Sequence, residues 1–184
     1  MNAVAHDTAS VEHTLAAWRA AEDQVRARRH HTGLGRPEQF AGRSGIQIFE
    51  AMLAGEIPAP PITRTLNFLL VEAQPGRAVF QGQPLFDHYN PLGTVHGGWI
   101  ATLLDSAVAC AIHTLLPAGK TYTTLELKVN YIRGLTDQVP LVRAVGEVIH
   151  CGGKTGTSHG RLLGPDGTLF AHATTTCIVL DARG

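Results

Sequence analysis

One long apolar segment constrains the fold of this chain more than any other feature. It begins at Gly97, runs through Trp99 to Leu116, and carries Asp105 near its middle. The segment is longer than an average strand and rich in Ala and Leu, which favours a helix. A helix that is apolar nearly all round must be covered on most sides, and a membrane-spanning helix rarely carries an acid at its centre. The segment therefore predicts a helix buried inside a globular domain, with no membrane partner.

Strand-like runs lie on both sides of this helix. Two precede it, Arg64 to Glu72 and Arg77 to Pro84, and the turn signal Pro75-Gly76 separates them. One helix with a mostly antiparallel sheet is an α+β fold, and an all-round apolar helix requires the sheet to wrap it. Such a sheet leaves an edge and a face for a second subunit, so a homodimer is expected. The four strands after the helix are expected at residues 121–132, 139–149, 155–163 and 168–180.

The first 60 residues differ in texture from the rest of the chain. Apolar residues recur at helical spacing from about Ser10 to Arg29, which predicts an amphipathic helix capped by Ser10. A shorter helix is expected from Gly45 to Leu53, and three prolines predict an extended connection from Ile57 to Ile62. We therefore divide the chain into a helical extension, residues 1–60, and a core domain, residues 61–184.

Charge balance and cysteine spacing argue against several functional classes. Lys and Arg number 15, as do Asp and Glu, so no basic field attracts nucleic acid or an anionic membrane. The three widely spaced cysteines indicate neither a disulfide framework nor a zinc site. No signal peptide is recognisable at the beginning of the sequence, so a cytoplasmic location is expected. The sequence predicts no metal and no cofactor.

The run Asn-Pro-Leu-Gly-Thr-Val-His-Gly-Gly, from Asn90 to Gly98, leads directly into the apolar helix. Its paired glycines, Gly97 and Gly98, permit close approach to the first helical turn and leave the N–H groups there exposed. These donors and the positive end of the helix dipole suit a developing oxyanion or a polarised thioester carbonyl. The alternative is that the glycines only relieve crowding where the helix meets the sheet.

Asp105 shares its helical stripe with mostly apolar side chains, where an unpaired charge is costly. It is either a catalytic carboxylate or a satisfied core acid that fixes helix register or a subunit contact. Gly97 and Asp105 are eight positions apart, roughly 12 Å along one helix axis. One substrate carbonyl cannot contact both in a single chain. If they cooperate, two helices must run antiparallel, and each site is then shared between two subunits.

From about Ile62 to Leu180 the chain resembles the hotdog-fold thioesterases of the phenylacetate-degradation (PaaI-like) group. The motif Asn-Pro-x-Gly-x-x-His-Gly-Gly, with an acid eight residues after its first paired glycine, carries this resemblance. The resemblance implies a hotdog fold and hydrolysis of an acyl-CoA to a carboxylic acid and free CoA. It also implies homodimers that pair into tetramers. Two rivals stay open, namely a hotdog acyl-CoA hydratase or dehydratase and a non-catalytic acyl-CoA binding module.

The same resemblance assigns roles to four residues around the helix. Asp105 matches the general base or nucleophile, and Gly97 matches the backbone N–H that polarises the carbonyl. Asn90 matches an amide side chain that orients substrate or water. His96 stands at the helix entrance, where it either bonds near the thioester or caps the helix and braces the loop.

Thr124 matches a Ser or Thr that positions the water or the carboxylate. Strand alternation puts Thr124 on a polar face with Glu126 and Lys128, opposite Leu127. That face fits a wet crevice and equally fits plain solvent exposure.

The CoA tail requires contacts for its phosphates and a slot for pantetheine. The resemblance suggests the helix start and two loops at strand ends for this purpose, and the alternative is that the loop residues are ordinary surface positions. The predicted CoA-binding residues are Gly98, Arg133, Gly134, Gly153, Lys154 and Thr155.

Overall fold

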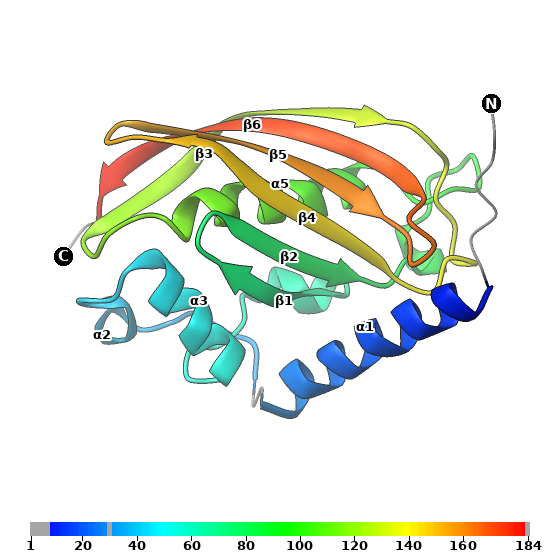
Figure 1. Cartoon of the computed structure of the whole chain (residues 1–184), viewed down its shortest axis with the longest axis horizontal. Helices are drawn as coiled ribbons and strands as arrows, with labels where there is room; N and C mark the ends of the chain where they lie inside the picture. Colours follow the sequence, from blue (N-terminus) through cyan, green and yellow to red (C-terminus); the bar gives the residue numbers. More distant parts are fainter. Residues whose placement is uncertain (1–7, 29–30, 183–184) are drawn as a thin grey trace.

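A computed structural model describes residues 8–28 and 31–182 of the chain. One long helix, α5, lies inside a strongly curved sheet, and the N-terminal helices lie outside it (Figure 1). The helices are α1 (Thr8–Arg28), α2 (Pro37–Phe40), α3 (Gly45–Ala54), α4 (Ile62–Thr65), the 3-10 turn η1 (Phe86–His88) and α5 (Gly97–His113). The strands are β1 (Phe68–Gln74), β2 (Arg77–Gly82), β3 (Lys120–Tyr131), β4 (Val142–Cys151), β5 (Thr155–Leu163) and β6 (Leu169–Asp181).

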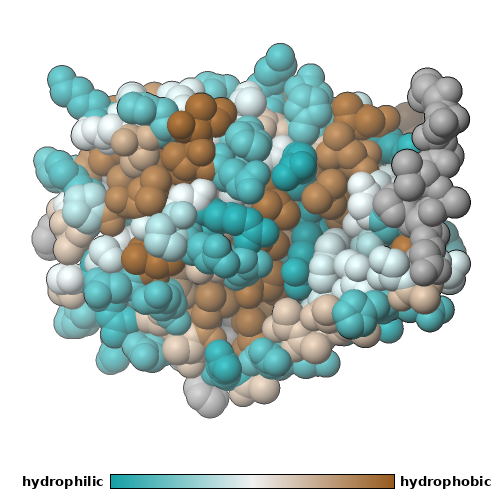
Figure 2. Space-filling view, viewed as in Figure 1, coloured by the Kyte–Doolittle hydropathy of each residue, from teal (hydrophilic) through white to brown (hydrophobic). Residues whose placement is uncertain are grey.

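All six strands form one antiparallel sheet in the order β1-β2-β4-β5-β6-β3. The predicted α+β hotdog fold is therefore confirmed, with one sheet wrapped around a central helix and a helical N-terminal segment. Apolar side chains on the surface gather in separate patches between polar ones on the face shown in Figure 2. Within the described residues, no helix has both the length and the hydrophobicity needed to cross a membrane.

The helix α5 is buried wherever the sheet faces it. Leu103, Leu104, Ala107 and Val108 have no exposed surface, and each fully buried Leu or Val side chain contributes about 1.5–3 kcal/mol. The contact is close because β4 presents Gly146 to the helix, where an added Cβ would lie only 2.2 Å from the Ala107 carbonyl oxygen. The remaining side of α5, which the chain leaves half exposed, carries the polar side chains Thr102, Asp105 and Ser106.

The strand boundaries differ from the predictions by more than two residues at two places, the starts of the first and fourth strands. Arg64 and Thr65 belong to α4 rather than to the first strand, because Thr63 uses both its N–H and its hydroxyl to bond the Pro60 carbonyl. This bonding closes a helical turn, for which proline's fixed φ is suited. The fourth predicted strand begins at Val142 rather than Val139, whose N–H closes a turn onto Thr136.

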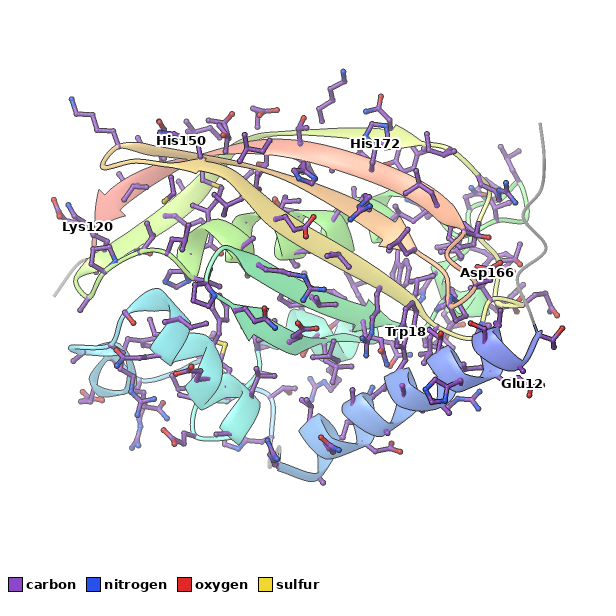
Figure 3. All side chains as sticks on the ribbon, in the orientation of Figure 1. Glu12, Trp18, Lys120, His150, Asp166 and His172 are labelled. Carbon is purple, nitrogen blue, oxygen red and sulfur yellow. The ribbon has the colours of Figure 1, made fainter. Side chains whose placement is uncertain are left out.

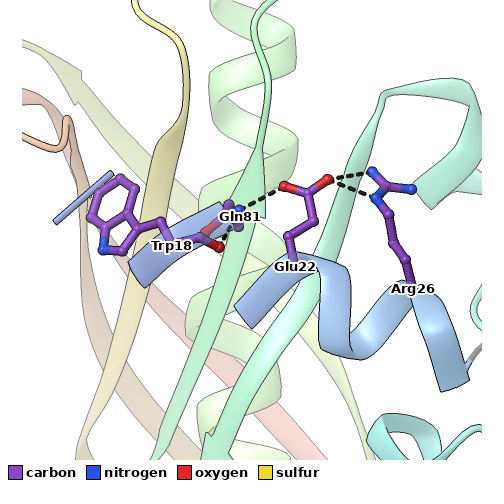
Figure 4. Close-up of polar contacts among 4 residues, drawn as sticks. All are labelled: Trp18, Glu22, Arg26 and Gln81. Carbon is purple, nitrogen blue, oxygen red and sulfur yellow. Dashed lines mark hydrogen bonds and ion pairs between the residues drawn. The ribbon is translucent and has the colours of Figure 1, made fainter. Parts of the chain in front are cut away.

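A buried amide joins α1 to the outer face of the sheet. The fully buried Gln81 donates to the carbonyl of Trp18 and to the carboxylate of Glu22 (Figure 4). Its side-chain oxygen accepts from Arg143. The Arg143 guanidinium also lies 4.7 Å from the Trp18 ring centre, a cation–π geometry. These bonds satisfy the polar groups of Gln81 that α1 covers against the sheet.

The helix predicted from Ser10 to Arg29 is confirmed as α1 over Thr8–Arg28, and Arg29 lies outside the described residues. Ser10 is inside the helix rather than its cap, so that prediction is wrong; its carbonyl accepts the Thr14 hydroxyl. The helix predicted from Gly45 is confirmed; it ends at Ala54 and is capped by Gly55, which has a left-handed backbone. Farther along the chain, His150 and His172 lie on the convex face of the sheet, away from α5 (Figure 3).

Candidate active site

Asp105 lies on the half-exposed side of α5, next to the edge strand β3. The Thr124 hydroxyl donates to its carboxylate oxygen Oδ1 at 3.1 Å. Burial raises the pKa of the Asp105 carboxyl above its ordinary value, and the Thr124 hydrogen bond lowers it by less. A held carboxylate with a raised pKa is a better proton acceptor than a free one, which suits a general base.

Thr124 reaches Asp105 because β3 contains a β-bulge. Thr124 pairs with Cys177 and Glu126 pairs with Thr176, so Leu125 is an extra residue between them. The extra residue reverses the alternation of the strand. Thr124 therefore faces α5 together with Leu127, while Glu126 faces away and is exposed. The predicted polar face shared by Thr124 and Glu126 is wrong for this reason.

Buried thiols lie close to this carboxylate but do not form a nucleophile. The Cys177 thiol is 4.0 Å from the Thr124 hydroxyl, and the Cys110 thiol is 3.6 Å from the Tyr122 hydroxyl. Burial raises the pKa of the Cys110 thiol to about 12 and also raises the pKa of Cys177. Both thiols are thus protonated at neutral pH, whereas attack on a thioester requires the thiolate.

The entrance of α5 leaves one backbone donor uncommitted. His96 caps the helix, because its Nδ1 accepts the Gly98 N–H at 2.8 Å and its carbonyl accepts the Trp99 N–H at 3.0 Å. Capping is one of the two roles that the sequence left open for His96. No acceptor among residues 8–28 and 31–182 bonds the Gly97 N–H. This donor is therefore available to an oxyanion.

A cavity of about 290 Å³ opens at the same helix entrance. It brings together four predicted residues, namely Asn90, Gly97, Arg133 and Gly134, together with Tyr131, which was not predicted. Tyr131 had no stronger sequence signal than an aromatic side chain just before Arg133-Gly134. The Asn90 side chain also braces its own loop, donating to the Thr94 hydroxyl at 2.9 Å and accepting the Leu92 N–H at 2.8 Å.

The other predicted CoA-binding residues do not reach this cavity within one chain. Gly153 and Lys154 lie in the exposed turn between β4 and β5, and Thr155 is the exposed first residue of β5. The next residue, Gly156, packs on Ile112 near the C-terminal end of α5, opposite the end where Gly97 lies.

Asp105 and Thr124 do not line the cavity either. Gly98 lies beside the His96 ring, next to the cavity-lining Gly97.

The Thr124 bond leads to a first prediction. Replacing Thr124 with Ala removes a donor that favours the charged carboxylate, so the pKa of Asp105 should rise further. Thr124→Ser keeps the hydroxyl and should leave the pKa close to that of the unmodified protein. NMR of the Asp105 carboxyl carbon as a function of pH gives this pKa in the unmodified protein and in both variants. Equal pKa values in the Ala and Ser variants would show that Thr124 does not influence the carboxylate.

Comparison with known proteins identifies similar sequences and structures. The model of the thioesterase superfamily matches residues 92–171, which include all of α5 and β3 to β5. No curated protein matches the chain.

Solved structures match over most of their own length. The TT0310 protein from Thermus thermophilus is 30% identical, with a TM-score of 0.57, and the match covers 64% of this chain and 96% of that one. A mutant of the phenylacetic acid degradation protein PaaI from the same organism is 29% identical, with a TM-score of 0.57 and coverage of 64% and 97%. A phenylacetic acid degradation-related protein from Ralstonia eutropha JMP134 is 29% identical, with a TM-score of 0.65 and coverage of 71% and 98%.

Proposed function

We propose, from the premise that this chain belongs to the thioesterase superfamily and is a thioester hydrolase, that its substrate is an acyl-CoA. The products are then a carboxylic acid and free CoA. The observation that supports the proposal most directly is the half-buried carboxylate of Asp105, with its raised pKa and its hydrogen bond from Thr124. Within the described residues, no three His, Cys, Asp or Glu side chains form a metal-binding group.

In the proposed mechanism, Asp105 accepts a proton from water while the water oxygen attacks the thioester carbon. The Gly97 N–H donates to the carbonyl oxygen, where negative charge develops. Collapse of the tetrahedral intermediate breaks the carbon–sulfur bond, and Asp105 returns its proton to the CoA sulfur. Direct attack by Asp105, through a mixed anhydride that water then hydrolyses, uses the same two groups. Incorporation of oxygen-18 from water into Asp105 during a single turnover distinguishes the second route from the first.

We propose that these two groups come from different chains. Gly97 and Asp105 are eight positions apart, about 12 Å along α5, and the cavity at Gly97 does not include Asp105. The edge strand β3 has 12 residues and one unpaired side in the described sheet. A second copy that pairs with this edge by a twofold axis places the two α5 helices antiparallel, with the Asp105 of one chain toward the Gly97 of the other. A tetramer made from two such dimers is the assembly that we expect.

Arg133 is exposed and lines the cavity, and we propose that its guanidinium binds a CoA phosphate. In an antiparallel pair, the turn at Gly153, Lys154 and Thr155 lies at the end of α5 that approaches the cavity of the other chain. This arrangement would bring the two predicted CoA-binding groups together. The cytoplasmic location expected from the sequence stays a prediction.

The test is thiol release over short, medium, long and aromatic acyl-CoAs. Aromatic substrates belong in the panel because two matched structures are named for phenylacetic acid degradation. We expect equal amounts of free CoA and carboxylic acid from at least one substrate. Loss of the crotonyl-CoA double bond without thiol release would favour a hydratase. Tight CoA binding with no reaction across the panel would favour a binding module.

A further inference from the structure

We infer that Tyr131 is a positioning residue that holds the first peptide of α5, and with it the Gly97 N–H, in place for the thioester carbonyl. The inference rests on the proposed function. It adds a residue outside the Asn90–Gly98 motif and outside the set of residues predicted from the sequence. The supporting contacts come from the end of β3 and the beginning of α5.

The Tyr131 hydroxyl donates to the Gly97 carbonyl oxygen at 2.9 Å. The N–H of the same peptide unit belongs to Gly98 and donates to His96 Nδ1 at 2.8 Å. Both ends of the Gly97–Gly98 peptide are therefore tied to side chains. The preceding peptide is tied at its His96 carbonyl by the Trp99 N–H, which leaves the Gly97 N–H as its unpaired end within the described residues. A peptide plane fixed in this way presents its free donor in one direction, which preorganises it for an oxyanion.

The Tyr131 ring also lies directly against Gly97. A Cβ added at position 97 would lie 3.0 Å from both Cζ and Oη of Tyr131. Because residue 97 is glycine, the Tyr131 phenol can lie over the helix entrance. The missing side chain also permits a substrate to approach the backbone closely. Tyr131 lines the cavity with Gly97 and keeps 54% of its surface exposed, so the ring forms part of the wall that a substrate meets.

Substitution by Phe isolates the hydroxyl. Tyr131→Phe keeps the ring against Gly97 and removes only the hydrogen bond to its carbonyl. We expect kcat to fall by roughly three- to tenfold, the range that one hydrogen bond supports, with KM and the pH dependence of kcat little changed. The matched control is Tyr89→Phe, which removes a hydroxyl with two bonds to Asp137 and none to α5. The control should keep the unmodified kcat.

A spectroscopic measurement tests the contact without any substrate. The sequence contains two Gly-Gly pairs, Gly97-Gly98 and Gly152-Gly153. With glycine labelled by carbon-13 at the carbonyl and by nitrogen-15, only these pairs correlate an amide with a labelled preceding carbonyl. The Tyr131→Phe change should move the Gly97 carbonyl signal upfield, since a hydrogen bond deshields a carbonyl carbon. The Gly152 signal is the internal control, and it is assigned by its loss in Gly153→Ala, where an added Cβ meets nothing within 4 Å.

The two readouts separate failure of this inference from failure of the proposed function. An unchanged kcat in Tyr131→Phe, or an unmoved Gly97 carbonyl signal, overturns the role of Tyr131 while leaving the hydrolase intact. Equal losses of kcat in the Tyr131 and Tyr89 variants overturn it as well. If the unmodified protein hydrolyses no acyl-CoA, the proposed function fails. The glycine spectrum then still decides whether Tyr131 holds the helix entrance.

Discussion

Asp105→Asn is expected to lower the turnover of acyl-CoA by about a thousandfold, the middle of the range for a general base. An amide cannot accept the proton of the attacking water, and it is a poor nucleophile toward a thioester. The shape of the side chain is preserved, and the Thr124 hydroxyl still has an oxygen acceptor at this position. Thiol release under saturating substrate measures the loss.

The Asn variant should be at least as stable as the unmodified protein at neutral pH. The pKa of Asp105 is raised in the folded state, so the folded chain binds this proton more tightly than the unfolded chain does. The stability of the fold therefore decreases as pH rises through the pKa of Asp105. Removing the charge removes that penalty, and thermal unfolding at two pH values would show it.

Asp181→Asn is the matched control for Asp105→Asn. Asp181 is exposed at the end of β6 and pairs with Lys120 at 2.5 Å, a surface ion pair that contributes about 0–1 kcal/mol. This variant should hydrolyse acyl-CoA normally. Near-normal hydrolysis by Asp105→Asn as well would remove Asp105 from the mechanism.

Gly97→Pro is expected to lower kcat by about a hundredfold or more, the usual effect of losing an oxyanion donor. Proline lacks the N–H, and its ring is compatible with the first residue of a helix. His96 already has φ −60° and ψ 134°, close to the extended region that a residue before proline prefers. Gly97→Ala is the matched control, because it introduces the same Cβ beside Tyr131 and keeps the N–H.

A mixture of the two damaged chains tests whether the site is shared. In a heterodimer of Asp105→Asn and Gly97→Pro chains, one site carries both defects and the other carries neither. Purified heterodimers with two different affinity tags should therefore recover about half of the normal activity per dimer, as twofold symmetry requires. If verified heterodimers stay as inactive as either parent, Gly97 and Asp105 do not act across the subunit boundary.

Local signals in the sequence determined most of the fold. The composition of the segment from Gly97 predicted α5, and α5 begins at that residue. The Pro75-Gly76 signal predicted the turn between β1 and β2, where Gly76 has φ +78°. Such features depend on residues close together in the chain, so a sequence pattern can identify them. The sequence of this segment also indicated Asp105 and the paired glycines before it as candidate site residues.

Only the tertiary structure decided which side chains contact Asp105 and Gly97 in the candidate site. The bulge at Leu125 forms where β3 pairs with β6, about 50 residues away in the sequence, and it turns Thr124 toward Asp105. Tyr131 reaches Gly97 only because the sheet brings the end of β3 over the start of α5. Contacts between distant segments depend on register and packing, which alternation within one strand cannot specify. The sequence therefore identified the carboxylate and the helix entrance, while the fold selected the side chains that hold them.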